Sequence, residues 1–227
     1  MNKKLERVKG YFTEEQLNQL NNKKVLIIGL GGVGGLVCET LIRNGVYHFG
    51  LCDGDIVEES NFNRQIIAIN KNIGLNKVDA MTNRLKEIED NIEIDSFPFF
   101  IDKETIHNID FTRYDLILDC IDDVIAKVLI IEKAKELNIN IISSMGTGNK
   151  CDPNGFKIVN INQTCYCPLA KRVRTELKKI GITDVQVCFS SEIPLKGSSN
   201  IISPMFVVGS ASFVIVKRAL EILAASN

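Results

Sequence analysis

The sequence predicts an α/β protein built on a doubly wound, mostly parallel sheet. An apolar, β-branched run at 24–28 passes directly into a glycine-rich turn and a helical segment. Further runs of strand length follow at 47–52, 92–97, 115–120 and 140–144, and amphipathic helical stretches separate most of them. Parallel strands need crossover connections of this length, so the repeated alternation indicates a parallel sheet with helices on its faces.

Composition narrows the class of protein. The 227 residues are 45% hydrophobic and 24% charged, as expected for one globular domain spanning 1–227, with a nucleotide-binding half at about 22–150 and a C-terminal half at about 151–227. A net charge of −1 excludes a global basic field for nucleic acid, so any RNA contact needs a local patch. No apolar run approaches the length of a membrane span, and the seven cysteines fit buried thiols in a reducing cytoplasm.

The first turn carries four glycines in the pattern Gly29-x-Gly31-Gly32-x-Gly34, and a helix is predicted from Leu36 to Arg43. Glycine lets the backbone turn sharply and approach a phosphate, while a helix N-terminus offers free N–H groups to the anion. By itself this turn would first suggest a nicotinamide or flavin dinucleotide.

An acidic pair ends the second strand. Asp53 lies 19 residues after Gly34, where a nucleotide-binding α/β fold places the acid that accepts hydrogen bonds from a ribose, and Asp55 follows it. The alternative is an ordinary surface aspartate at a strand end.

Residues 57–65 form an irregular polar segment. A dehydrogenase would instead pass directly into its second helix at this point. The segment contains Asn61, Arg64 and Gln65, and Lys77 follows before a helix predicted over 78–89. An arginine as a two-pronged donor and a lysine as a point charge suit the charge of a triphosphate, although either alone would more often be a surface residue.

Asp122 and Asp123 follow the predicted strand at 115–120, where parallel sheets bind ligands. A carboxylate there could hold Mg²⁺ against ATP phosphates. Both residues also open the next predicted helix, so capping is the competing role for one of them.

The C-terminal half is predicted as a strand at 156–161, a helix at 168–180, a strand at 185–189, a polar loop at 196–203 and a helix at 206–223. The last helix contains Gly209 to Ser212, small residues that permit close packing. The basic outer face of the helix at 168–180 is either solvated or in contact with RNA phosphates, and its members are Lys171, Arg172, Arg174, Lys178 and Lys179. Residues 1–12 are predicted to be a solvated tail, with a helix starting at Thr13.

In order and spacing, these motifs resemble the ubiquitin-activating-like adenylyltransferase superfamily, which has a Rossmann-like fold. The matching elements are the glycine motif, Asp53-x-Asp55, Asn61-x-x-Arg64-Gln65, Lys77 and Asp119-Cys120-Ile121-Asp122. The resemblance implies binding of ATP·Mg²⁺ and attachment of AMP to a carboxylate. It places Asp53 on the ribose, Asn61, Arg64 and Lys77 around the phosphates, and Asp122 at the metal and the reacting phosphate.

Members that activate sulfur-carrier proteins usually bear two zinc-binding Cys-x-x-Cys pairs, whereas this chain has only Cys165-x-Cys167. Its C-terminal segments are instead similar to tRNA threonylcarbamoyladenosine dehydratases, at 144–153, 167–174 and 187–192. That similarity implies ATP-dependent cyclisation of a modified adenosine beside the tRNA anticodon. Two departures are Asp123, where a neutral polar residue is commoner, and Lys4-x-x-Arg7, where the superfamily has two arginines.

The resemblance also implies partners. Relatives form two-fold dimers in which an N-terminal arginine reaches the other subunit's triphosphate, and Arg7 holds the matching place. Cys188 falls where some relatives carry a cysteine linked to sulfur relay, which raises a cysteine desulfurase or sulfur acceptor as a partner, although a structural thiol is favoured. The alternatives are an adenylyltransferase for a ubiquitin-like carrier, a binding module that lost activity, and a nicotinamide dehydrogenase.

Overall fold

The computed structural model describes residues 3–195 and 201–225. Its sheet has seven strands in the order β3-β2-β1-β4-β5-β7-β6, all parallel except the antiparallel pair β6–β7, which confirms the predicted fold class. The strands are β1 (Lys24–Ile28), β2 (His48–Cys52), β3 (Glu93–Phe97), β4 (Leu116–Asp119), β5 (Asn140–Ser144), β6 (Phe156–Asn160) and β7 (Gln186–Ser190).

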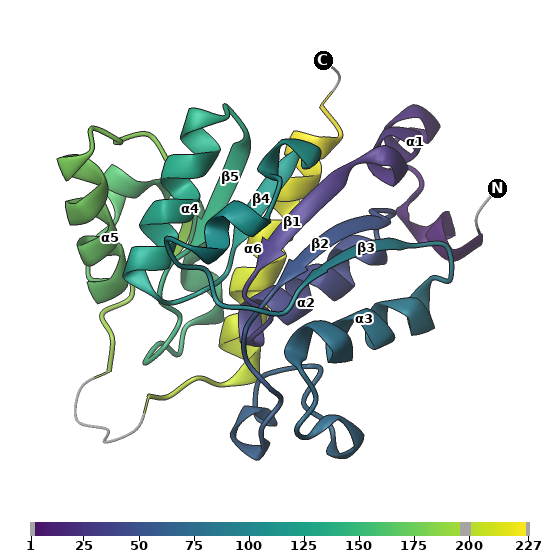
Figure 1. Cartoon of the computed structure of the whole chain (residues 1–227), viewed down its shortest axis with the longest axis horizontal. Coiled ribbons are helices and arrows are strands. Elements are labelled where there is room, and N and C mark those ends of the chain that lie inside the picture. The colour runs from purple at the N-terminus through teal and green to yellow at the C-terminus, as the bar shows by residue number, and fades with distance from the viewer. Residues whose placement is uncertain (1–2, 196–200, 226–227) are drawn as a thin grey trace.

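Two helical layers enclose the sheet (Figure 1). The helices are α1 (Glu14–Asn22), α2 (Gly32–Ile42), α3 (Lys77–Ile88), α4 (Val124–Glu136), α5 (Pro168–Lys179) and α6 (Met205–Leu223). One hydrophobic core joins the sheet to α1, α2, α3 and α6, and a second joins it to α4 and α5. Because both faces are covered, the central strands are apolar on both sides, as the uninterrupted apolar runs predicted.

One predicted boundary is wrong. Helix α2 begins at Gly32, inside the glycine motif, rather than at Leu36. Glycine is a poor helix former, so local propensity argues against this start. Close packing of the first turn against β1 overrides the propensity, because only a residue without a Cβ fits there. The other predicted helices and strands are confirmed with small shifts at their ends. Residues 196–200 of the predicted polar loop lie outside the described residues.

The N-terminal segment is also more ordered than predicted. Residues Lys3–Val8 form a 3₁₀ turn, η1, whose Leu5 side chain is only 4% exposed. A Cβ built on Gly45 would lie 3.2 Å from Leu5 Cδ1, so the segment packs closely against the end of α2. Thr13 caps α1 in a capping box with Gln16, as predicted.

Helix α6 packs along α2 through its small residues. The Ser212 hydroxyl donates to the Val33 carbonyl at 3.0 Å, and a Cβ on Gly209 would lie 3.6 Å from Leu36. Phe206 and Phe213 of the same helix stay 59% and 57% exposed. Gly209 and Ser212 therefore contact α2 within the subunit and are buried, whereas Ser210 is partly exposed. No helix in the described ranges is long and apolar enough to cross a membrane.

Candidate nucleotide-binding and adenylation site

The glycine loop between β1 and α2 is shaped by contacts that exclude side chains. Gly29 has φ +91°, and its N–H donates to the Cys52 carbonyl at 2.8 Å. A Cβ on Gly34 would lie 1.8 Å from the Gly29 oxygen, so no other residue fits. No side chain caps α2 at Gly31. The first N–H groups of α2, from Gly32 onward, therefore remain available to an anion.

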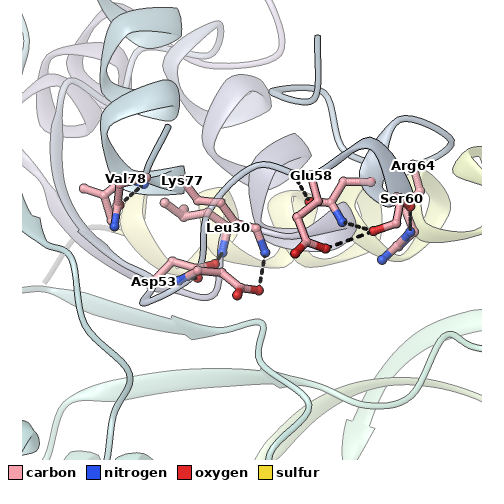
Figure 2. A network of polar contacts seen from close by, with 10 residues as sticks. Leu30, Asp53, Glu58, Ser60, Arg64, Lys77 and Val78 are labelled. Carbon is pink, nitrogen blue, oxygen red and sulfur yellow. Dashed lines mark hydrogen bonds and ion pairs between the residues drawn. The ribbon is translucent and has the colours of Figure 1, made fainter. Parts of the chain in front are cut away.

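Asp53 and Lys77 lie beside this loop (Figure 2), and Asp55 pairs with Lys77. The Asp53 carboxylate ends β2 and accepts hydrogen bonds from the Leu30 N–H at 2.7 Å and the Asp55 N–H at 2.9 Å. Lys77 opens α3, and its Nζ lies 2.7 Å from Asp55 Oδ2. The lysine side chain is 6% exposed, whereas that of Asp55 is 56% exposed. This pair fixes a buried ammonium at the rim of the site.

The predicted polar segment holds Arg64 next to the glycine loop. Arg64 Nη1 donates to the Ser60 carbonyl at 2.9 Å (Figure 2). The same nitrogen donates to Asn63 Oδ1, also at 2.9 Å. The stem of the arginine lies against Gly32, where an added Cβ would be 3.4 Å from Arg64 Cγ. The guanidinium has no carboxylate partner among the described residues, so its charge is uncompensated.

The two amides of this segment differ. Asn61 is buried and its side chain stabilises the local turn, with the Glu58 N–H donating to Asn61 Oδ1 at 3.2 Å. Gln65 is 6% exposed, its Oε1 has no hydrogen-bond partner, and its Nε2 lies 3.9 Å from a Cβ built on Gly31. In this structure Asn61 holds the loop, whereas Gln65 retains an unused acceptor beside it.

The competition between Asp122 and Asp123 is resolved. Asp123 caps α4 by accepting a hydrogen bond from the Ala126 N–H at 2.8 Å. Asp122 is exposed and has no hydrogen bond or ion pair within the described part of the chain. No group of three His, Cys, Asp or Glu residues that could hold a metal occurs in the described ranges.

Arg7 is not brought to this site within one subunit. It lies on η1, beside the amino ends of the strands, while the glycine loop lies at their carboxyl ends (Figure 1). The five residues of β1 alone separate the two edges by about 16 Å at ~3.3 Å per residue.

Sequence reasoning missed a buried polar network under the Asp122 loop, formed by Asp119, Lys127 and Ser143. All three residues are 0% exposed. A lysine inside the apolar run 124–131 was the available signal, since an unpaired lysine is rarely buried.

The C-terminal half gives two further results. Four of the predicted basic residues are exposed on α5, namely Lys171, Arg172, Lys178 and Lys179, of which Lys179 pairs with Glu176 at 2.7 Å. Arg174 instead turns inward to the Thr164 carbonyl and hydroxyl. Cys188 is 1% exposed, and burial raises the pKa of its thiol to about 12. A thiol with so high a pKa is a poor nucleophile at neutral pH.

A comparison with protein families decides the family. The model of the ThiF family matches residues 5–225. The chain belongs to the ThiF family. It is 38% identical to the tRNA threonylcarbamoyladenosine dehydratase of Bacillus subtilis, over 80% of this chain and 72% of that protein. It is 31% identical to the adenylyltransferase and sulfurtransferase UBA4 of Candida glabrata, over 66% of this chain and 34% of that protein.

Solved structures of the ThiF family show the same fold. The crystal structure of Escherichia coli tRNA N6-threonylcarbamoyladenosine dehydratase in complex with AMP superposes with a TM-score of 0.89 and 27% identity, covering 96% of this chain and 91% of that one. Its complex with ATP gives a TM-score of 0.88. The resemblance to dehydratases within the family is thereby confirmed.

Proposed function

We propose that the chain is an ATP-dependent tRNA threonylcarbamoyladenosine dehydratase. The observation that carries this proposal is the likeness along nearly the whole chain to a dehydratase crystallised with AMP and with ATP. Residues 1–227 act as one ATP-binding unit of the cytoplasm, in which the half at 22–150 holds the nucleotide.

ATP would lie along the carboxyl ends of β1, β2 and β4. The phosphates meet the glycines of the loop and the free N–H groups of α2, because these groups point at an anion and no side chain covers them. Asp53 accepts hydrogen bonds from the ribose, since it ends β2 beside Leu30. Asp55 acts through Lys77, whose ammonium it holds at 2.7 Å.

The charges around the phosphates would promote adenylation. Arg64 has no carboxylate partner in the described ranges and Lys77 is buried, so both cations can bind the leaving pyrophosphate. Asn61 and Gln65 lie behind Arg64 and supply amide groups. Asp122 would hold Mg²⁺, which neutralises negative charge on the phosphates when bound.

The reaction joins a nucleotidyl-transfer step to an intramolecular acyl-transfer step. A carboxylate oxygen of the threonylcarbamoyl side chain attacks the α-phosphorus of ATP, and pyrophosphate leaves. An internal nucleophile of the same side chain then attacks the activated carbonyl, a ring closes and AMP leaves. The second step is intramolecular, so the chain has mainly to position the two groups and to exclude water.

The test is direct. Purified protein is incubated with ATP, Mg²⁺ and tRNA that carries threonylcarbamoyladenosine. We expect AMP, pyrophosphate and a nucleoside whose mass has fallen by one water. If neither AMP nor the mass change appears with protein of proven fold, the proposal is wrong.

The second candidate is an adenylyltransferase for a ubiquitin-like sulfur carrier, favoured by the likeness to UBA4. The sequence has no Cys-x-x-Cys pair, since only one residue separates Cys165 from Cys167, and no metal-binding cluster occurs in the described ranges. A carrier ending in Gly-Gly that stimulates pyrophosphate exchange, where modified tRNA does not, would reverse the order of the two candidates.

Assembly as a homodimer is part of the proposal. Arg7 is exposed, has no partner in the described residues and lies at the far edge from its own glycine loop, so only a second subunit could bring it to a triphosphate. Phe206 and Phe213 supply an exposed apolar strip on α6 that suits an interface between identical subunits.

tRNA is the proposed substrate, through its anticodon arm. The exposed cations of α5 that could meet its phosphates are Lys171, Arg172, Lys178 and Lys179, without Arg174. A cysteine desulfurase or sulfur acceptor stays a prediction, but a relay through Cys188 is disfavoured because its thiol is buried.

A further inference from the structure

Three polar side chains meet in the interior where β4, α4 and β5 pack together. Lys127 Nζ lies 2.9 Å from Asp119 Oδ2 and 3.2 Å from Ser143 Oγ, and the Ser143 hydroxyl donates to Asp119 Oδ2 at 2.5 Å. A buried ion pair is weak evidence for stability, because apolar side chains of similar volume often serve as well. Another role for the network is therefore worth testing.

The second oxygen of Asp119 faces the loop that leads to Asp122. Asp119 Oδ1 accepts a hydrogen bond from the Ile121 N–H at 3.3 Å, while Lys127 and Ser143 hold Oδ2. Both carboxylate oxygens are thus occupied, and the carboxylate has one orientation. Ile121 directly precedes Asp122 in the chain.

Two more contacts fix the same loop. The Cys120 N–H donates to the Ile28 carbonyl at 2.8 Å, and Asp123 caps α4. Cys120 also lies against the glycine loop, since a Cβ on Gly29 would be 2.9 Å from its carbonyl carbon. The backbone is therefore held on both sides of Asp122, whose own side chain has no partner in the described chain.

We propose that Asp119, Lys127 and Ser143 form a positioning network that sets the place of the Asp122 carboxylate for adenylation. This inference rests on the proposed function. None of the three touches the substrate, because all are fully buried. A carboxylate displaced by about 1 Å can lower turnover on the order of 10²-fold. ATP affinity is set mainly by groups elsewhere in the site and changes little.

The variants must avoid an unpaired buried charge, which would unfold the protein. D119L/K127M replaces the pair by apolar side chains of similar size. D119N/K127M also removes both charges, but its amide oxygen can still accept the Ile121 N–H. K133M/E136Q is the matched control, because it removes the Lys133–Glu136 ion pair of the same helix, whose side chains are 34% and 57% exposed.

We expect D119L/K127M to lose about 30- to 100-fold in kcat for AMP release, with a Kd for ATP within about threefold of the parent. We expect the kcat of D119N/K127M to be at least tenfold higher than that of D119L/K127M, and the control to keep the kcat of the parent. Native kcat in folded D119L/K127M, equal losses in both double variants, or a parallel rise in Kd overturns the proposal.

Hydrogen exchange separates this inference from the proposed function. In protein without ATP or tRNA, the peptide at 118–124 exchanges faster in D119L/K127M than in D119N/K127M or the control. Equal exchange overturns the positioning role, whereas absence of AMP from the parent enzyme refutes only the proposed reaction. If the double variants do not fold, Ser143→Ala decides. It should raise exchange at 118–124 and lower kcat severalfold, and unchanged values of both overturn the proposal.

Discussion

The amino and carboxyl edges of the sheet differ in whether their charged side chains form ion pairs within the chain. At the amino edge, acids and bases beside the strand ends neutralise one another in the pairs Lys23–Asp115 at 2.9 Å, Arg113–Asp95 at 3.2 Å and Lys24–Glu93 at 3.8 Å. At the carboxyl edge, Arg64 binds only a carbonyl and an amide oxygen, and Asp122 has no partner in the described residues. We interpret the charges that are paired within the chain as serving the fold. We interpret the charges of Arg64 and Asp122, which have no oppositely charged partner in the described residues, as indicating a ligand.

Two residues show how far this comparison extends. Lys77 lies at the carboxyl edge and is matched, because Asp55 holds its buried ammonium in place. Arg7 lies at the amino edge and is unmatched within the described chain. The proposed contact of Arg7 with the triphosphate of a second subunit would account for this unmatched charge.

The largest effect is expected at the unmatched charges of the carboxyl edge. Asp122→Ala and Arg64→Ala should each lower kcat/KM for AMP formation by about 10²-fold or more, because each removes a charge that we propose to act on the reacting phosphates. Their melting temperatures should stay near that of the parent. Asp123→Ala is the control, and it should destabilise the protein by about 1 kcal/mol through loss of the α4 cap. A folded, fully active Asp122→Ala variant would remove its assignment.

A smaller effect, on the order of tenfold, is expected for Arg7→Ala, since one cation among several is lost from the triphosphate. Mixing Arg7→Ala subunits with Asp122→Ala subunits tests whether the arginine acts across the dimer. A mixed dimer then has one site with both groups intact and recovers part of the activity. A monomer by light scattering, or no recovery after proven subunit exchange, contradicts the role.

The substitution Cys188→Ala tests whether a residue near the carboxyl edge takes part in the reaction merely because it lies there. Cys188 lies on β7 near that edge, but burial raises its pKa to about 12. We expect AMP formation within about threefold of the parent and a stability loss of about 1 kcal/mol from the buried gap. Chemical denaturation measures the stability, and a large loss of turnover at unchanged stability would revive a chemical role for the thiol.

The smallest effect is expected for a matched pair of the amino edge. Lys23→Met removes the ion pair with Asp115 but leaves Asp115 Oδ2 to accept the Lys24 N–H at 2.8 Å. Partly exposed ion pairs contribute about 0.2 to 1 kcal/mol, so unfolding in urea should shift slightly and turnover should not change. A tenfold loss of turnover in Lys23→Met would contradict the interpretation that the paired charges of the amino edge serve only the fold.

Local patterns predicted most of the fold. The apolar runs of β1, β2, β4 and β5 and the cap at Thr13 depend on residues close together in sequence. The glycine motif likewise predicted a tight turn, because Gly34 must lie against Gly29 only five residues earlier. The start of α2 could not be predicted, since packing overrode the low propensity of glycine.

The missed features all depend on contacts between distant segments. Order at Leu5 requires its contact with Gly45, and Arg174 turns inward because Thr164 offers it acceptors. The Asp119–Lys127–Ser143 network needs β4, α4 and β5 in place before its ion pair exists. For Asp122 and Asp123, the sequence limited the cap to two neighbours, and only the geometry chose Asp123.

Contact between α6 and the glycine loop has a consequence for biosynthesis. A Cβ on Gly32 would lie 3.2 Å from Val208, and the Ser212 hydroxyl holds the Val33 carbonyl in the first turn of α2. Chains emerge from the ribosome N-terminus first. The Ser212 hydroxyl is made 179 residues after the Val33 carbonyl that it holds, so the nascent loop waits for its supporting helix. ATP affinity should be acquired only after α6 has left the exit tunnel, so a segment made early is completed by one made much later.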